Sequence, residues 1–159
     1  MVDGVQALWQ AYCEAAGEDP SSLGAVERFG DSAEMANELL GLVLAGTKTA
    51  TAGLARDYAE TGEPLPEPGG HWIAVDGHGV ARCVLRTVEI RLGTLGTVDE
   101  DFARDEGEGD RSRAWWLDAH RQFFVRQYQH TERPFDEEQG EVVFECFQLV
   151  WPPGWARKP

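Results

Sequence analysis

The sequence contains very little lysine and no long apolar segment. Among its 159 residues only Lys48 and Lys158 are lysines, and no run approaches the roughly 20 apolar residues that a membrane-spanning helix needs. The first residues, MVDGVQALWQ, also lack the basic start and apolar core of a secretion signal. We therefore expect a cytoplasmic protein that does not insert into a membrane.

Paired cysteines are absent as well. Cys13, Cys83 and Cys146 are odd in number, far apart and set among apolar residues. A structural zinc site uses about four Cys or His ligands at short spacings, and the histidines here do not supply them. The sequence thus predicts buried free thiols, no bound metal and no cofactor.

Positive charge is scarce, because 14 basic side chains face 28 acidic ones and the net charge is −14. Such a protein repels polyanions, and binding to a long nucleic acid depends on several Lys or Arg contacts with phosphates. The only loose group of basic residues is Arg104, Arg111 and Arg113, among acidic neighbours. These features argue against extended nucleic acid as a partner and favour a small polar molecule such as a nucleoside. A monomer and a homodimer both fit the sequence.

The length fits one domain over residues 1–152, followed by a short flexible tail over residues 153–159. Apolar spacing predicts helices at about 5–16, 31–46, 54–60, 99–105 and 111–130, and strands at about 26–29, 71–75, 80–91 and 141–151. Asp31 followed by Glu34 is typical of a capping box that opens the second helix. Helices and strands intermix without a regular βαβ repeat, which predicts an α+β fold: a small barrel-like sheet flanked by helices.

Lys48 is the first candidate for chemistry. Because arginine carries the positive charge almost everywhere else, a retained lysine suggests a need for its primary amine, which can lose a proton when desolvated. Thr47, Thr49 and Thr51 alternate around it, and a neutral amine can turn a neighbouring hydroxyl into a nucleophile for an acyl carbon. Alternatively, Lys48 is an ordinary surface charge after a helix, and the threonines reflect strand propensity alone.

An acidic segment at residues 105–110 is the second unusual feature. It contains Asp105, Glu106, Glu108 and Asp110, separated by glycines that let a carboxylate approach a ligand closely. One of these acids is a candidate site residue, whereas the others are expected to be solvated or to cap the next helix. A Mg²⁺ or Ca²⁺ site is the alternative, but the spacing lacks the pattern of a calcium-binding loop.

Six tryptophans are present, and most are expected in the core. Trp72 follows the proline-rich segment 62–70, and Trp115 follows the acidic segment. Both are candidates to line a pocket and to stack on a base.

Residues 46–51, Gly-Thr-Lys-Thr-Ala-Thr, resemble the GxKTxT signature of the ASCH (activating signal cointegrator homology) domain family. Residues 27–32, residues 106–110 and the pattern of Trp116, His120 and Phe123-Phe124 support this resemblance. The similarity extends from about Trp9 to Pro152 and is to the longer bacterial subgroup. It implies a PUA-like fold, with a small β-barrel, flanking helices and a cleft lined by the signature.

Family members with known activity include bacterial amidohydrolases that hydrolyse N(4)-acetylcytidine with a Lys, a Thr and a Glu. The resemblance implies that Lys48 is the base and Thr51 the nucleophile. Glu106, with Glu108 as the alternative, would position the lysine or the leaving amine. The residues then expected to contact the substrate are Thr49, Arg28, Trp72, Glu108 and Trp115.

The chain differs from these enzymes after the second threonine, where Ala52 and Gly53 replace an arginine. Other ASCH proteins resemble ribonucleases or nucleic-acid-binding modules, so membership of the fold does not fix the function. RNA binding or cleavage of single-stranded RNA would need a locally basic cleft, for which the candidates are Lys48, Arg28, Arg82 and Arg86. A third possibility is a domain that binds a modified nucleoside without catalysis and that tolerates loss of Thr51.

Overall fold

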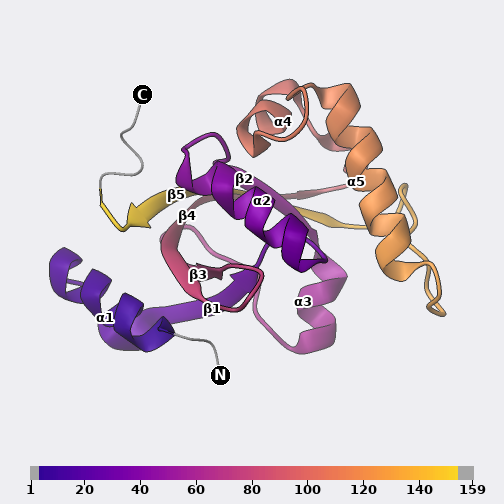
Figure 1. The fold of residues 1–159 in the computed structure, drawn as a ribbon. Coiled ribbons are helices and arrows are strands. Elements are labelled where there is room, and N and C mark those ends of the chain that lie inside the picture. The colour runs from indigo at the N-terminus through magenta and orange to yellow at the C-terminus, as the bar shows by residue number, and fades with distance from the viewer. Residues whose placement is uncertain (1–3, 154–159) are drawn as a thin grey trace.

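The computed structural model describes residues 4–153, which form one curved sheet with helices packed around it (Figure 1). The α-helices of this part are α1 (Val5–Ala16), α2 (Ala33–Leu44), α3 (Ala55–Thr61), α4 (Glu100–Glu106) and α5 (Arg113–Tyr128). Its strands are β1 (Leu23–Arg28), β2 (Ala50–Leu54), β3 (His71–Val75), β4 (Ala81–Gly93) and β5 (Val142–Trp151). The predicted α+β fold is confirmed, with the sheet forming a half-barrel.

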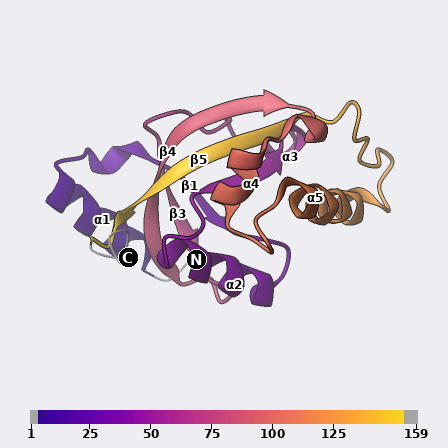
Figure 2. The ribbon, with the colours of Figure 1, turned by 90° about the horizontal axis from the view of Figure 1, so that it is seen from above.

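The strand order in the sheet is β1-β3-β4-β5-β2. Strand β1 is parallel to β3, and the other neighbouring pairs are antiparallel. The register between β4 and β5 shifts near residues 84–85 and 87–89, and such irregularities bend a sheet. Figure 2 shows the result, with β4 and β5 running together along the curve of the sheet.

Helix α2 begins one residue later than the sequence pattern predicts. The side chain of Ser32, not that of Asp31, accepts the hydrogen bond from the backbone N–H of Met35. Asp31 instead forms an ion pair with Arg126, 2.9 Å away. The predicted capping box is therefore wrong, because a serine next to Asp31 has the geometry to cap the helix and Asp31 has a partner elsewhere.

The end of α2 delivers Lys48 to the sheet. Gly46 has a positive φ of 83°, a conformation that glycine adopts without a steric penalty. The backbone N–H groups of Thr47 and Lys48 then both donate to the carbonyl oxygen of Leu42, at 3.0 and 3.1 Å. The helix thus closes tightly, and the chain enters β2 two residues after Lys48.

Helix α5 packs against the core through three buried aromatic residues. Its buried residues are Trp116, Phe124 and Tyr128, whereas Ala119 and Phe123 are only half-buried. With α4, the helix covers one face of β2 and β5, where the core includes Phe102 and Phe144. The opposite face of the sheet carries a second cluster beneath α2, composed of Phe29, Leu40, Val43, Trp72, Ala74, Cys83, Leu85 and Phe147.

Several smaller predictions have mixed outcomes. The cysteines are free, and Cys13 and Cys83 are buried, but Cys146 is only half-buried. In the described part of the chain, every helix is too short or too polar to cross a bilayer. Apart from residue 153, the predicted C-terminal tail lies outside the described residues, so the domain boundary stays a prediction.

Candidate active site

Lys48 lies at the centre of a buried cluster of charged side chains. Its Nζ is 3.1 Å from Glu106 Oε1 and 3.1 Å from Glu108 Oε2, although the residue is only 2% exposed. The ammonium also lies 5.6 Å from the centre of the Phe29 ring. Burial of an ammonium is costly unless carboxylates pair with it, and here two of them do so.

Backbone hydrogen bonds on the C-terminal side of Lys48 hold this residue in place. The N–H of Thr49 donates to the carbonyl oxygen of Asp105 at 2.7 Å, and its carbonyl oxygen accepts from the N–H of Phe147 at 3.0 Å. The segment is thereby joined to α4 on one side and to β5 on the other. Because Asp105 directly precedes Glu106, the same contact sets the distance between the lysine and its carboxylate partner.

Gly107 permits this close approach of the two segments. Its φ is +72°, and an added Cβ would lie 2.5 Å from the carbonyl oxygen of Thr47. Any other residue would therefore push α4 away from the loop that carries Lys48. A residue with a side chain would not fit between Glu106 and Glu108, because the backbone of Thr47 occupies that space.

Glu106 is held by three groups besides its backbone. Its Oε1 faces Lys48, while its Oε2 lies 2.9 Å from Nε2 of His120 and accepts a hydrogen bond from the indole N–H of Trp116. The residue is only 1% exposed. Both oxygens are thus fully engaged, which fixes the orientation of the group.

His120 is doubly protonated in this arrangement. Its Nδ1 lies 2.9 Å from the carbonyl oxygen of Trp116, which can only accept, so Nδ1 carries a hydrogen. Its Nε2 faces the carboxylate of Glu106 and therefore carries one too. Burial opposes the charge, but Glu106 outweighs burial and raises the pKa of His120. The ring also stacks on Trp116 with the ring centres 3.8 Å apart.

The two carboxylates differ in how readily they take up a proton. Burial alone would raise the pKa of Glu106, but Lys48 and His120 hold this pKa well below its usual range. Burial raises the pKa of Glu108, because Lys48 offsets only part of the desolvation and the like charge of Glu106 lies nearby. Glu108 is therefore the group that accepts a proton first.

The amine of Lys48 is charged in the resting site. Burial favours the neutral amine, yet Glu106 and Glu108 together raise the pKa of Lys48 above its usual value. The cluster contains two cations, Lys48 and His120, and two carboxylates, so its charges balance. A lysine base in this site must first pass its own proton to a neighbour.

Thr49 and Thr51 follow Lys48 along the chain, and within residues 4–153 neither hydroxyl bonds to its amine. Thr51 is half-buried on β2 and pairs with Glu145 of β5. The exposed hydroxyl of Thr49 lies 3.4 Å from the carbonyl oxygen of Asp105. Thr49 therefore contributes to the attachment of this loop to α4.

Two of the residues expected to contact the substrate lie at the surface. Arg28, at the end of β1, is exposed, and among the described residues it forms no ion pair with the cluster. Trp115 is 37% exposed, and its ring covers Gly109 so closely that a Cβ there would overlap the ring. Trp115 thus covers the acidic segment from outside.

Trp72 also packs against Phe29 and bonds to a different carboxylate. Its ring centre is 5.5 Å from that of Phe29, and its indole N–H donates to Glu145 Oε2 at 3.0 Å. The hydroxyl of Thr87 donates to the same oxygen at 2.8 Å. Glu145 thus places a buried carboxyl group in the middle of β5, a strand whose other residues are mostly apolar.

His120 and Trp116 belong to the cluster but were not predicted as site residues. A signal for His120 exists in the sequence, because residues 116, 120, 124 and 128 follow one another at a spacing of four and so share one helix face. A histidine within an otherwise aromatic, buried stripe needs a polar partner. The identity of that partner, Glu106, depends on how α4 packs against α5.

Metal binding is a chemical alternative for three of these residues. One ligand atom each from Glu106, Glu108 and His120 lie within 4.8 Å of one another. The ammonium of Lys48 already bridges the two carboxylates, however, and Nε2 of His120 carries a proton. A metal ion would have to displace both cations, so these residues do not fit a resident metal.

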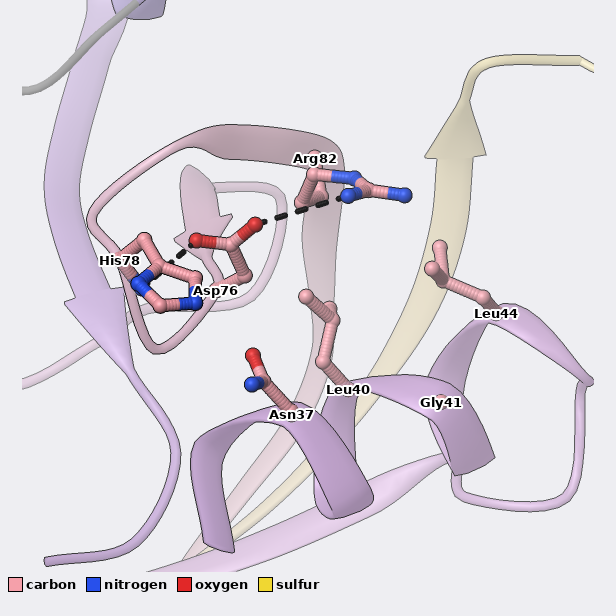
Figure 3. A pocket seen from close by; sticks show the side chains of 7 residues that line it. All are labelled: Asn37, Leu40, Gly41, Leu44, Asp76, His78 and Arg82. Atoms are coloured by element: carbon pink, nitrogen blue, oxygen red, sulfur yellow. Dashed lines mark hydrogen bonds and ion pairs between the residues drawn. The ribbon is translucent and has the colours of Figure 1, made fainter. Parts of the chain in front are cut away.

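Two surface hollows lie apart from the cluster. One, of about 340 Å³, lies between α2 and the β3–β4 hairpin; Figure 3 shows Asp76 there, joined to Arg82 and to the backbone of His78, opposite Leu40 and Leu44. The hydrogen bonds of Asp76 hold the hairpin turn. The other, of about 230 Å³, is acidic and lies on the α4 side of the sheet. Neither hollow is lined by Lys48, Glu106 or Glu108.

Residues 25–151 match the ASCH domain family. The chain belongs to this family. An ASCH domain from Lactobacillus crispatus JV V101 is 31% identical to it, with a TM-score of 0.80 over 91% of this chain and 92% of that chain. A protein from Enterococcus faecalis V583 is 28% identical, with a TM-score of 0.82 over 95% and 92% of the two chains. No curated protein shows significant similarity to this ASCH domain.

Proposed function

We propose that this ASCH domain is an amidohydrolase that removes an acyl group from the amino group of a nucleoside-like small molecule. The observation that carries the proposal is Lys48, a buried amine held 3.1 Å from each of two carboxylates. Lys48 and His120 lower the pKa of Glu106, which favours its ionised form, whereas burial raises the pKa of Glu108, which favours uptake of a proton. Such a pair supplies both a fixed negative charge and a proton acceptor.

In the proposed reaction the hydroxyl oxygen of Thr51 attacks the acyl carbon. The hydroxyl proton passes to Lys48 as Lys48 passes its own proton to Glu108, so the cluster gains one proton and the negative charge moves to the oxygen of the tetrahedral intermediate. The C–N bond then breaks, and the leaving amine takes a proton from Lys48, which recovers one from Glu108. Water hydrolyses the ester on Thr51 by the same route and releases the acid.

Lys48 is therefore a base only in partnership with Glu108. Glu106 remains ionised throughout, oriented by His120 and Trp116, and keeps the amine in position. Hydrogen bonds between catalytic groups often tighten only when substrate is present, and we assign the Thr51–Lys48 contact to that complex.

The charge of the chain supports a small neutral substrate. The net charge is −14, and the positive charge of Lys48 is neutralised by its two carboxylate partners. Arg82 lies 3.5 Å from Asp76 near a different hollow, so it adds no positive charge beside Lys48. A nucleoside fits these conditions better than a long polyanion does.

The test is incubation of the wild type with a panel of N-acylated nucleosides, including N(4)-acetylcytidine, and in parallel with labelled single-stranded RNA. Thr51→Ala and Lys48→Arg should lose deacylation, whereas Thr131→Ala, a change at an exposed threonine beyond α5, should retain it. RNA cleavage that depends on Lys48, in the absence of deacylation, would favour the ribonuclease alternative. Nucleoside binding without turnover would favour a non-catalytic binding domain.

A further inference from the structure

A second buried carboxylate, that of Glu145, lies on the same side of the sheet as Thr51. We infer that Glu145 forms a subsite that binds an N–H donor or cationic group of the substrate, and that this subsite selects uncharged nucleosides over nucleotides. The inference rests on the proposed function for the reaction, but the binding that it describes can be measured without turnover.

Glu145 is buried without a positive partner. The residue is only 4% exposed, and among the described residues no lysine, arginine or histidine forms an ion pair with it. Its hydrogen bonds come from two neutral donors, Trp72 and Thr87. Burial raises the pKa of Glu145, and those two bonds offset only part of this effect. Glu106 has two cationic partners, so the two buried carboxylates differ sharply.

One oxygen of Glu145 remains available. Both hydrogen bonds reach Oε2, and no described residue donates to Oε1. Among the described side chains that are not exposed, the only fully enclosed polar atom without a partner is Nε of Arg56. Oε1 is therefore not sealed in the core but retains contact with solvent. Trp72 and Thr87 hold the carboxylate from one side and leave this oxygen free to accept a bond from a ligand.

The register of the sheet places this oxygen near the proposed nucleophile. Thr51 of β2 and Glu145 of β5 are directly paired, and paired residues on adjacent antiparallel strands project to the same face. Phe29 connects the two clusters, because its ring contacts both the ammonium of Lys48 and the ring of Trp72. A molecule whose acyl carbon reaches Thr51 therefore extends past Glu145.

The surroundings of Glu145 are acidic. The pKa of Glu27 is raised to about 7 by desolvation, by the neighbouring carboxylate of Glu63 and by that of Glu145. Burial, together with Glu145 and Glu27, also raises the pKa of the Tyr58 hydroxyl. No cation contributes to either shift. A phosphate would be repelled here, whereas an amino or ring N–H group would be attracted.

The experiment compares Glu145→Gln with Glu141→Gln. The glutamine at position 145 removes the charge but keeps an oxygen that can accept from Trp72 and Thr87, and Glu141 is an exposed residue just before the same strand. Cytidine binding is measured by calorimetry in a Thr51→Ala background. We expect Glu145→Gln to weaken binding about 10-fold or more, as loss of a charge-assisted hydrogen bond does, and Glu141→Gln to leave it unchanged.

The kinetic arm uses N(4)-acetylcytidine and its 5′-monophosphate. The wild type should prefer the nucleoside, and Glu145→Gln should raise KM for the nucleoside more than it lowers kcat and reduce the preference. Trp72→Phe and Thr87→Val each remove one hydrogen-bond donor to Glu145 and should produce part of the same KM effect. Unfolding midpoints are recorded for each variant, because Trp72→Phe also removes buried volume.

The outcomes separate this inference from the proposed function. Cytidine binding that depends on Glu145, in a protein that deacylates nothing, would support the subsite and overturn the hydrolase. Deacylation and cytidine binding that are both unaffected by Glu145→Gln would uphold the hydrolase and overturn the subsite. Equal activity on the nucleoside and its monophosphate would also overturn the selectivity that we infer.

Discussion

The amine of Lys48 lies 3.1 Å from a carboxylate oxygen of Glu106, although 58 residues separate the two along the chain. The contact exists because the loop after α2 is hydrogen-bonded to the end of α4 and because Gly107 lets the two backbones approach. The charge pair is thus a product of tertiary packing. Because the same charge pair supports both the fold and the proposed reaction, a substitution that breaks it should lower both the stability of the domain and its activity.

Loss of Lys48 should destabilise the fold. Lys48→Met would leave the buried carboxylate of Glu106 and the half-buried one of Glu108 without their shared cation, and breaking a buried ion pair typically costs about 3–5 kcal/mol. Lys48→Met combined with Glu106→Gln should be less destabilised than the sum of the single changes. Denaturant unfolding of the four proteins measures this coupling, and strict additivity would contradict the pairing.

Gly107 should be far more sensitive to substitution than a comparable glycine elsewhere. Gly107 and Gly62 both end helices with positive φ, but only at Gly107 would a Cβ collide with the backbone of Thr47. Gly62→Ala should cost roughly 1–2 kcal/mol from the left-handed conformation alone. Gly107→Ala should cost clearly more and should also reduce activity, because it separates Glu106 from Lys48. Equal costs in thermal unfolding would argue against the close approach.

The proposed reaction should depend on pH through Glu108. Because the carboxylate must be ionised to take the proton of Lys48, kcat/KM should rise with pH through a pKa above the usual range of glutamate. Glu108→Gln should remove the acidic limb along with most of the activity. A pH–rate profile without an acidic limb in the wild type would contradict the relay.

His120 should stay protonated at a pH where ordinary histidines are neutral. Its pKa in the folded protein is raised by Glu106, so its contribution to stability is fully present below the unfolded pKa and is lost as pH rises through the folded pKa. NMR titration of the imidazole measures the first effect, and unfolding of wild type and His120→Gln against pH measures the second. An ordinary titration of His120 would contradict the charge assignment.

Glu145 should lower stability when it is ionised. Because burial raises its pKa in the folded state, the wild type should lose stability as pH rises from the unfolded to the folded pKa of this group. Glu145→Gln lacks that carboxyl group and should lose less over the same interval, so it should equal or exceed the wild type near neutral pH. Unfolding free energies at several pH values test this, with Glu141→Gln as the matched control.

Much of the fold could be predicted from the sequence, because it depends on local patterns. Helix ends at Gly46 and Gly62, the hairpin around residues 76–79 and the β5 strand all leave direct signals in residue type and spacing. Which helix face is buried was harder to predict. In α5 apolar residues occur on several sides, and Trp116 turns inward where it packs against Phe102 of α4 and Phe144 of β5.

The candidate site could be predicted only in part. Lys48 stands out by its rarity and Glu106 by its place in a glycine-rich acidic segment, and the structure brings these two together. Their partnership with His120, and the burial of Glu145 beside Trp72, depend on contacts between distant segments. The charge state of Lys48 also depends on those contacts, since a lone desolvated lysine would lose its proton.

The most direct test of the account is to look for an acyl group on Thr51 during turnover. In separate reactions, the wild type, Glu108→Gln and the control Thr51→Ala are each mixed with N(4)-acetylcytidine and quenched in acid after milliseconds to seconds. The quenched protein is then digested and its peptides are analysed by mass spectrometry. The account predicts an acetyl ester on the peptide that contains Thr51, and no deacylation by Thr51→Ala. Deacylation by Thr51→Ala at the rate of the wild type would contradict it.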